Sequence, residues 1–75
     1  MSSLLPGHRD GVIKRVQPFE LHGERYYHLQ IDMEGSSNPV TEAKVAHDAI
    51  YDDPGPGDRV SVHLVMGLVT GIERR

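Results

Sequence analysis

The chain has 75 residues, no cysteine and a formal net charge of −3. A chain of this length makes a single domain with a small core, because it buries only about 60% of the surface that its unfolded form exposes. The lack of cysteine excludes disulfide cross-links and thiolate metal ligands. Seven acidic residues and one lysine lie within residues 32–58. This charge balance argues against a protein that binds nucleic acid mainly through its phosphates, because such proteins usually carry a surplus of basic residues.

Residues 1–10 contain Pro6, Gly7 and two serines and show no apolar periodicity. We therefore expect a flexible N-terminal arm over residues 1–10, followed by one small domain over residues 11–75. The arm lacks the basic start and apolar middle of a signal peptide, and no apolar run approaches the roughly 18 residues of a membrane helix. The expected location is cytoplasmic, with no membrane partner.

Residues 11–33 have the pattern of two strands joined by a tight turn. The segment GVIKRVQPF is rich in β-branched residues, and His22-Gly23 suits a turn because glycine tolerates a positive φ. The next segment, ERYYHLQIDM, alternates between apolar and polar residues. Its predicted inner face carries Tyr27, Leu29, Ile31 and Met33, and its outer face carries Tyr26, His28, Gln30 and Asp32.

The middle of the chain predicts a loop, a strand and a short helical turn. EGSSNP, residues 34–39, collects turn-forming residues. Residues 40–45 can alternate as a strand, while Ala43, Ala46, Ala49 and Ile50 recur at helical spacing. We therefore expect a strand over 40–46 and a helical turn over 46–52. PGPGD, residues 54–58, ends any helix because proline lacks the backbone donor and disfavours helix at the residue before it.

The C-terminal segment, DRVSVHLVMGLVTGIERR, predicts a hairpin with two available registers. A two-residue turn at Met66-Gly67 places Ser61 opposite Ile72 and mixes polar with apolar residues. A three-residue loop, with Gly67 left-handed and forming a bulge, gives one nearly apolar face through the pairs Leu64–Leu68, Val62–Thr70 and Val60–Ile72. We favour the loop because the wrong register exposes side chains worth roughly 1.5–3 kcal/mol each. This register leaves Val65 and Met66 at the tip and Val69 on the outer face.

The order of strand, strand, strand, short helix, strand, strand resembles an OB-fold, the five-stranded Greek-key barrel with a helix between its third and fourth strands. The resemblance rests on GVIKRV, on the hairpin into YYHLQIDM, and on PGDRVSVHLVMGLVTGIE. GDRVSV is also similar to SH3-like and Sm-like barrels, but the insert AHDAIYDD favours the OB-fold. The resemblance implies an all-β, single small β-barrel over residues 11–75 that binds its ligand along the outer face of the second and third strands.

Two binding functions compete. An aromatic residue with basic neighbours suits single-stranded DNA or RNA, and the candidate residues are Lys14, Arg15, Arg25, Tyr26, His28 and Lys44. These residues can equally be the ordinary polar face of an antiparallel strand. The alternative function is a protein interaction module, either a homodimer or an accessory subunit, that uses the acidic middle and the apolar residues Val65, Met66 and Val69.

We expect no metal, cofactor or catalytic site. The five histidines never fall in a ligand spacing such as H-x-x-x-H. The acidic segment HDAIYDDPGPGD lacks the alternating carboxylates of an EF-hand loop. The chain contains no G-x-S-x-G elbow and no phosphate-binding loop, and a barrel this small offers little concave volume for a substrate. The sequence therefore predicts a binding module rather than an enzyme.

Overall fold

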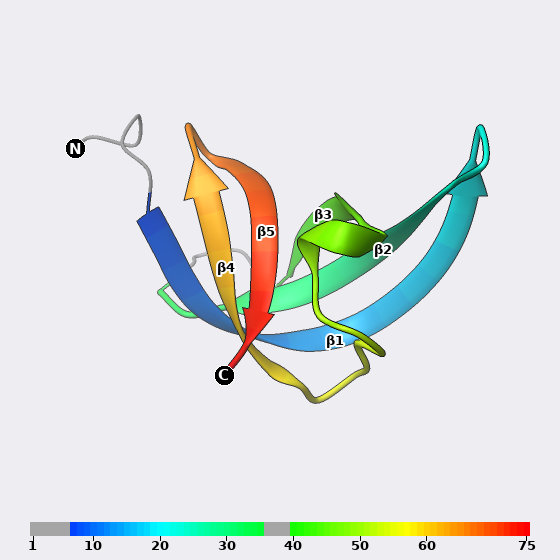
Figure 1. The fold of residues 1–75 in the computed structure, drawn as a ribbon. Coiled ribbons are helices and arrows are strands. Elements are labelled where there is room, and N and C mark those ends of the chain that lie inside the picture. Colours follow the sequence, from blue (N-terminus) through cyan, green and yellow to red (C-terminus); the bar gives the residue numbers. More distant parts are fainter. Residues whose placement is uncertain (1–6, 36–39) are drawn as a thin grey trace.

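A computed structural model describes residues 7–35 and 40–75. This part of the chain forms one five-stranded antiparallel sheet in the order β3-β2-β1-β4-β5 (Figure 1). The elements are β1 (Gly7–Leu21), β2 (Glu24–Met33), β3 (Thr41–Ala46), the 3-10 turn η1 (His47–Ala49), β4 (Arg59–Val65) and β5 (Leu68–Arg74). The predicted all-β class is confirmed. The helical insert is a single three-residue turn, within the predicted range but shorter than it.

The long strand β1 lies at the centre of the sheet and pairs with a different strand on each edge. Its first half pairs with β4, from Gly7 opposite Leu64 to Val12 opposite Arg59. From Gly11 onward it pairs with β2. The predicted arm is therefore wrong for residues 7–10, which hydrogen-bond as a strand, and residues 1–6 lie outside the described residues.

Two local features allow β1 to curve through the sheet, as Figure 1 shows. At Gly11 the strand passes so close to β2 that a Cβ atom would lie 2.8 Å from Ile31 Cγ2 and 3.0 Å from the Asp32 carbonyl oxygen. Lys14 is an extra residue between Ile13, which pairs with Ile31, and Arg15, which pairs with Gln30. Such a bulge increases the local twist and bends the strand.

The hairpin between β1 and β2 turns at His22-Gly23, as predicted. Both residues have positive φ, 54° and 81°, which is the geometry of the two-residue turn that matches strand twist. The predicted alternation of β2 is also confirmed, because Leu29 and Ile31 are fully buried while Asp32 is exposed. Of the predicted loop, residues 34 and 35 form a turn, and residues 36–39 lie outside the described residues.

The predicted register of the C-terminal hairpin is wrong, although Gly67 does have a left-handed φ of 81°. The turn has two residues, Met66-Gly67, and the bulge lies further on, at Thr70. The observed cross-strand pairs of the hairpin are Val65–Leu68, Leu64–Val69, His63–Gly71, Val62–Ile72, Ser61–Glu73 and Val60–Arg74. The tight turn suits the strand twist, and the later bulge brings Val62 opposite Ile72. As a result Val60 and Val62 are buried, as expected, whereas Leu68 is 71% exposed rather than in the core.

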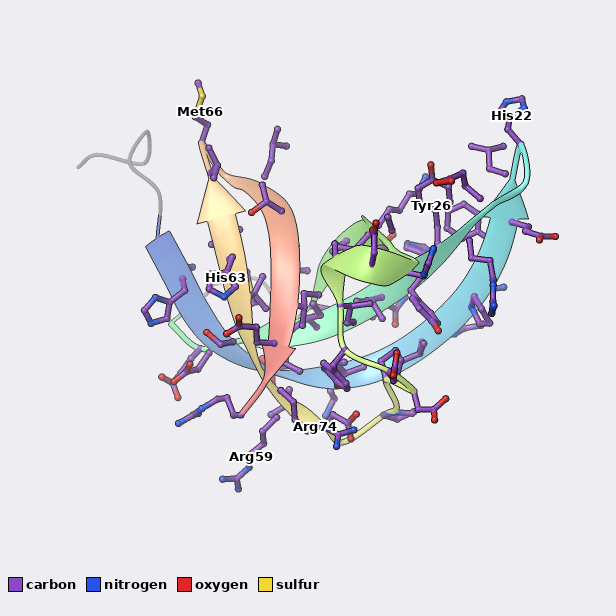
Figure 2. All side chains as sticks on the ribbon, in the orientation of Figure 1. His22, Tyr26, Arg59, His63, Met66 and Arg74 are labelled. Carbon is purple, nitrogen blue, oxygen red and sulfur yellow. The ribbon has the colours of Figure 1, made fainter. Side chains whose placement is uncertain are left out.

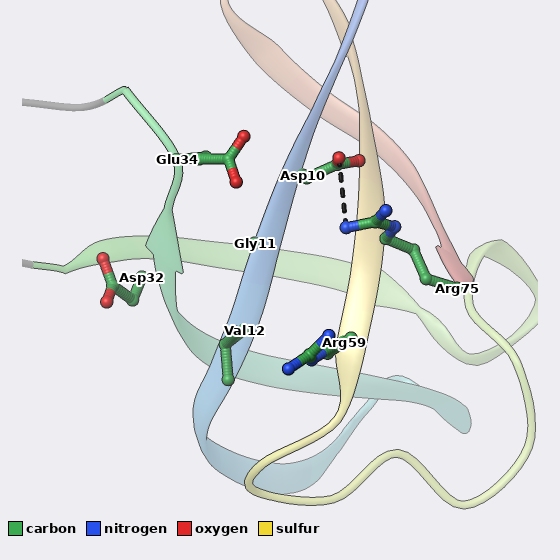
Figure 3. A pocket seen from close by; sticks show the side chains of 7 residues that line it. All are labelled: Asp10, Gly11, Val12, Asp32, Glu34, Arg59 and Arg75. Atoms are coloured by element: carbon green, nitrogen blue, oxygen red, sulfur yellow. Dashed lines mark ion pairs between the residues drawn. The ribbon is translucent and has the colours of Figure 1, made fainter.

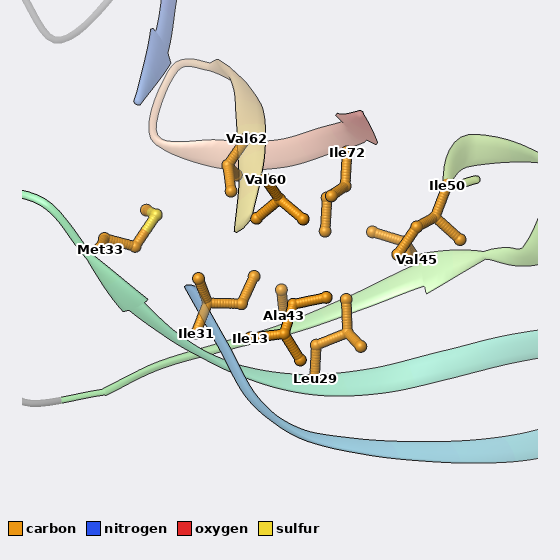
Figure 4. Packing of buried hydrophobic residues seen from close by; sticks show 10 residues of the cluster. All are labelled: Ile13, Leu29, Ile31, Met33, Ala43, Val45, Ile50, Val60, Val62 and Ile72. Carbon is orange, nitrogen blue, oxygen red and sulfur yellow. The ribbon is translucent and has the colours of Figure 1, made fainter. Parts of the chain in front are cut away.

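Ten buried apolar side chains from all five strands and the segment after η1 form the core (Figure 4): Ile13, Leu29, Ile31, Met33, Ala43, Val45, Ile50, Val60, Val62 and Ile72. The two edge strands approach each other at one end, where Ile50, just after η1, forms an isolated parallel bridge with Ile72 of β5. The core therefore lies between the β1-β2-β3 and β4-β5 parts of the sheet.

Candidate nucleic-acid interface

Strand pairing gathers polar and aromatic side chains on the face of β1, β2 and β3 that points away from the core. Successive side chains of a strand alternate between faces, and Leu29 and Ile31 fix the inner face. The outer face consequently holds three cross-strand rows: Arg15–Gln30–Glu42, Gln17–His28–Lys44 and Phe19–Tyr26–Ala46. We call these rows the outer face below.

An aromatic pair lies at one end of the outer face. The rings of Phe19 and Tyr26 are stacked, with centroids 5.4 Å apart and planes inclined by 17°. Both side chains are partly exposed. The His22-Gly23 turn produces this pair, because a two-residue turn places Leu21 opposite Glu24 and therefore Phe19 opposite Tyr26.

A shallow hollow of about 270 Å³ adjoins the aromatic pair and is lined by Gln17, Phe19, His28 and Lys44. His28 is held at its margin by Glu42, whose Oε1 lies 3.0 Å from His28 Nε2. The imidazole remains about a third exposed. The hollow therefore offers one aromatic ring, one imidazole, one amide and one ammonium group to a ligand.

The structure brings four of the six predicted nucleic-acid residues together on the outer face, namely Arg15, Tyr26, His28 and Lys44. Lys14 is exposed in the β1 bulge, without a cross-strand partner in β2. Arg25 pairs with Glu20 and lies on the opposite face of β2 from Tyr26. Sequence reasoning missed Phe19 and Gln17, although counting back from the His22-Gly23 turn would have found both.

The residues predicted for protein contact divide into two groups. Val65 and Met66 are exposed at the hairpin tip, by 40% and 63%. Val69 is half-buried against the core, whereas the predicted register placed it on the outer face of the hairpin. The difference arises because the bulge lies at Thr70, so Leu68 and Val69 point to the opposite faces from those predicted. Leu68 takes its place as the most exposed apolar residue there.

The acidic residues of the chain lie mostly elsewhere. A hollow of about 380 Å³ lies where β1 passes between β2 and β4, and it is lined by Asp10, Gly11, Val12, Asp32, Glu34, Arg59 and Arg75 (Figure 3). Asp10 Oδ2 and an Arg75 guanidinium nitrogen form an ion pair of 3.1 Å there. Among the described residues, no three His, Cys, Asp or Glu side chains are grouped as they would be around a metal ion.

A second polar cluster joins the connection before β4 to β5. The Tyr51 hydroxyl donates to Asp58 Oδ2 at 2.7 Å, and the Arg74 guanidinium lies 4.7 Å from the centroid of the Tyr51 ring. Burial, together with the Asp58 carboxylate, raises the pKa of Tyr51 to about 12. The hydroxyl of Tyr51 and the amide of Gly55, with help from Arg74, lower the pKa of Asp58. Asp58 Oδ2 accepts both the Tyr51 hydroxyl and the Gly55 amide, so the cluster organises the loop.

In comparisons with known proteins, no protein-family model, curated protein or solved structure matches this chain. Residues 7–35 and 40–75 contain no helix with the length and hydropathy of a membrane span.

Proposed function

We propose that this chain is a non-catalytic OB-like barrel that binds single-stranded DNA or RNA across the outer face. The strand order β3-β2-β1-β4-β5 supports the barrel, because pairing of the two edge strands is the one step needed to close the sheet. The parallel bridge between Ile50 and Ile72 lies where that closure would begin. The helical turn η1 stands between the third and fourth strands, as in the OB arrangement.

The observation that carries the binding proposal is the stacked Phe19–Tyr26 pair beside the hollow of His28 and Lys44. Single-stranded nucleic acid is recognised without sequence preference when bases stack on aromatic rings and cationic side chains follow the backbone. In this arrangement a base stacks at the aromatic pair, and the cations of Lys44 and Arg15 lie one and two rows away, respectively, for phosphate contact.

The distribution of charge favours the same surface despite the net charge of −3. Among the seven acidic residues of the middle segment, Glu42 belongs to the three rows of the outer face and is paired with His28. Asp32 lies on the same side of β2, beyond Gln30 and opposite Val12, at the end of the rows away from the aromatic pair. Asp32 and Glu34 line the hollow of Figure 3. The remaining four, Asp48, Asp52, Asp53 and Asp58, lie in the connection between β3 and β4. A local cationic patch is therefore compatible with an acidic chain.

Fluorescence anisotropy with a labelled single-stranded oligonucleotide tests the proposal. Phe19→Ala and Tyr26→Ala should each weaken binding about 5- to 150-fold, because stacking is worth about 1–3 kcal/mol per base. Lys44→Ala should weaken binding and reduce the salt slope by about one. Arg25→Ala is the matched control, since it removes one cation from the same sheet but from the opposite face, and it should change binding little. If the wild type caused no rise in the anisotropy of the oligonucleotide even at about 20 mM salt, the proposed function would be refuted.

A further inference from the structure

A groove of about 370 Å³ separates β3 from β5 on the side away from the Ile50–Ile72 bridge. It is lined by Met33, Thr41, Glu42, Ala43, Lys44, Leu64, Gly67, Leu68 and Val69. β3 and β5 are the two edge strands of the sheet, so the groove lies between two strand edges, and five of its lining residues are apolar: Met33, Ala43, Leu64, Leu68 and Val69. Exposed strand edges are a template for association unless something covers them.

Exposed apolar side chains are concentrated around this groove. Of the five large hydrophobic residues exposed in the described part of the chain, Leu68 lines the groove, Val65 and Met66 adjoin it at the hairpin tip, and Val40 directly precedes β3. The fifth, Leu21, lies at the other hairpin. Figure 2 shows these two hairpin tips, marked by Met66 and His22, well apart. A concentration of exposed apolar side chains on a small domain is typical of an interaction surface.

We propose that a second copy of this chain covers the groove in a two-fold dimer, with Leu68 and the hairpin tip of each copy seated at the groove of the other. A two-fold contact uses the same patch on both copies, so the patch must complement itself. The groove and the tip beside it are both largely apolar, so each offers the other an apolar surface across the axis.

The charges on the groove rim are also self-complementary. Glu42 and Lys44 both line the groove and lie on the same face of β3, on either side of Ala43. When two β3 strands face each other antiparallel about a two-fold axis level with Ala43, Glu42 of each copy lies opposite Lys44 of the other. Parallel facing would instead oppose like charges. The rim therefore selects an antiparallel dimer, in the way that charge pairs fix register and orientation at interfaces.

Light scattering coupled to size-exclusion chromatography, on the full chain without nucleic acid, tests this dimer. The wild type should have twice the 8.4 kDa mass of the chain. Leu68→Ser should raise the dimer dissociation constant about a hundredfold, because two buried leucines are lost per dimer. Leu21→Ser is the matched control at the other tip and should leave the mass unchanged. Circular dichroism verifies that both variants remain folded.

Charge exchange then tests the orientation. Glu42→Lys and Lys44→Glu should each weaken the dimer, and the double variant should restore it, because both pairs across the axis are exchanged together. A wild type that stays monomeric at millimolar concentration would overturn the proposal, and so would equal effects of Leu68→Ser and Leu21→Ser. Nucleic acid is absent from these measurements, and in the dimer Glu42 and Lys44 serve the contact between copies. The oligonucleotide test therefore rests on Arg15, Phe19 and Tyr26, which lie outside the groove lining, and failure of the dimer leaves that test standing.

Discussion

The hydroxyl of Tyr51 donates a hydrogen bond of 2.7 Å to Oδ2 of Asp58, which also accepts the backbone amide of Gly55 at 2.9 Å. One carboxylate oxygen thus closes the proline- and glycine-rich segment into a compact loop. Arg74 of β5 lies against the same two side chains, with a guanidinium nitrogen 4.0 Å from the carboxylate. The connection between β3 and β4 is thereby fastened to the edge strand β5.

Acid should loosen this connection. The pKa of Asp58 is lowered, first by the Tyr51 hydroxyl and then by the Gly55 amide. The carboxylate therefore stabilises the fold above its ordinary pKa, near 4, and this contribution is lost as the pH falls through the lowered value. We expect the melting temperature to fall on acidification less steeply in Asp58→Asn than in the wild type. Asp52→Asn, exposed in the same connection, is the control and should follow the wild-type profile.

Alkali should destabilise the fold through Tyr51. Its pKa is raised from 10.0 to about 12, chiefly by burial and then by Asp58. A raised pKa stabilises the folded state below the unfolded value, and that contribution disappears as the pH rises through the folded value. Urea unfolding at a series of pH values from neutrality upward should show a stability loss in the wild type that Tyr51→Phe reduces. Parallel profiles for the two proteins would contradict the assignment.

The close approach of β1 to β2 at Gly11 should make this position intolerant of any side chain. An alanine Cβ would lie 2.8 Å from Ile31 Cγ2 and 3.0 Å from a backbone oxygen of Asp32, which cannot move aside alone. We expect Gly11→Ala to lower the free energy of unfolding by about 1–3 kcal/mol, the usual cost of overpacking. Gly7→Ala lies in the same strand with open space around it and should have little effect in the same denaturation assay.

Glu42 should oppose oligonucleotide binding, because its carboxylate lies on the outer face and hydrogen-bonds His28. Glu42→Gln removes this negative charge and should increase affinity several-fold at low salt, with the gain declining as salt increases. Glu73→Gln offers the matched control: it makes the same charge change in a pair with His63, at 3.4 Å, on a different part of the sheet. Equal gains in both variants would mean that net charge, and not this face, governs binding.

Much of the fold followed from alternation and turn chemistry. The strict apolar and polar alternation of ERYYHLQIDM predicted β2 and its faces, and His22-Gly23 predicted the first turn. The C-terminal register could not be predicted in the same way, because a bulge at Thr70 and a bulge at Gly67 both restore an apolar face. Periodicity reveals that a phase change exists, but the twist of the strands decides where it lies.

The candidate site was only partly predictable for a related reason. Tyr26, His28 and Lys44 follow from the faces of β2 and β3. Arg25 does not belong with them, because it is adjacent to Tyr26 in β2 and adjacent strand residues point to opposite faces. Phe19 follows only from the register that the His22-Gly23 turn sets, because a two-residue turn places it opposite Tyr26. The cross-strand register, rather than the periodicity of either strand alone, locates the aromatic pair.

The double pairing of β1 also determines when the molecule can fold. Its second half can form a hairpin with β2 as soon as residues 22–33 are available, because a two-residue turn closes that pairing at little entropic cost. Its first half pairs with residues 59–64, which a ribosome releases only after most of the chain. During synthesis residues 7–10, which pair with β4 alone, therefore lack their partner strand until residues 59–64 have been made. Docking of the C-terminal hairpin is the long-range step that completes folding.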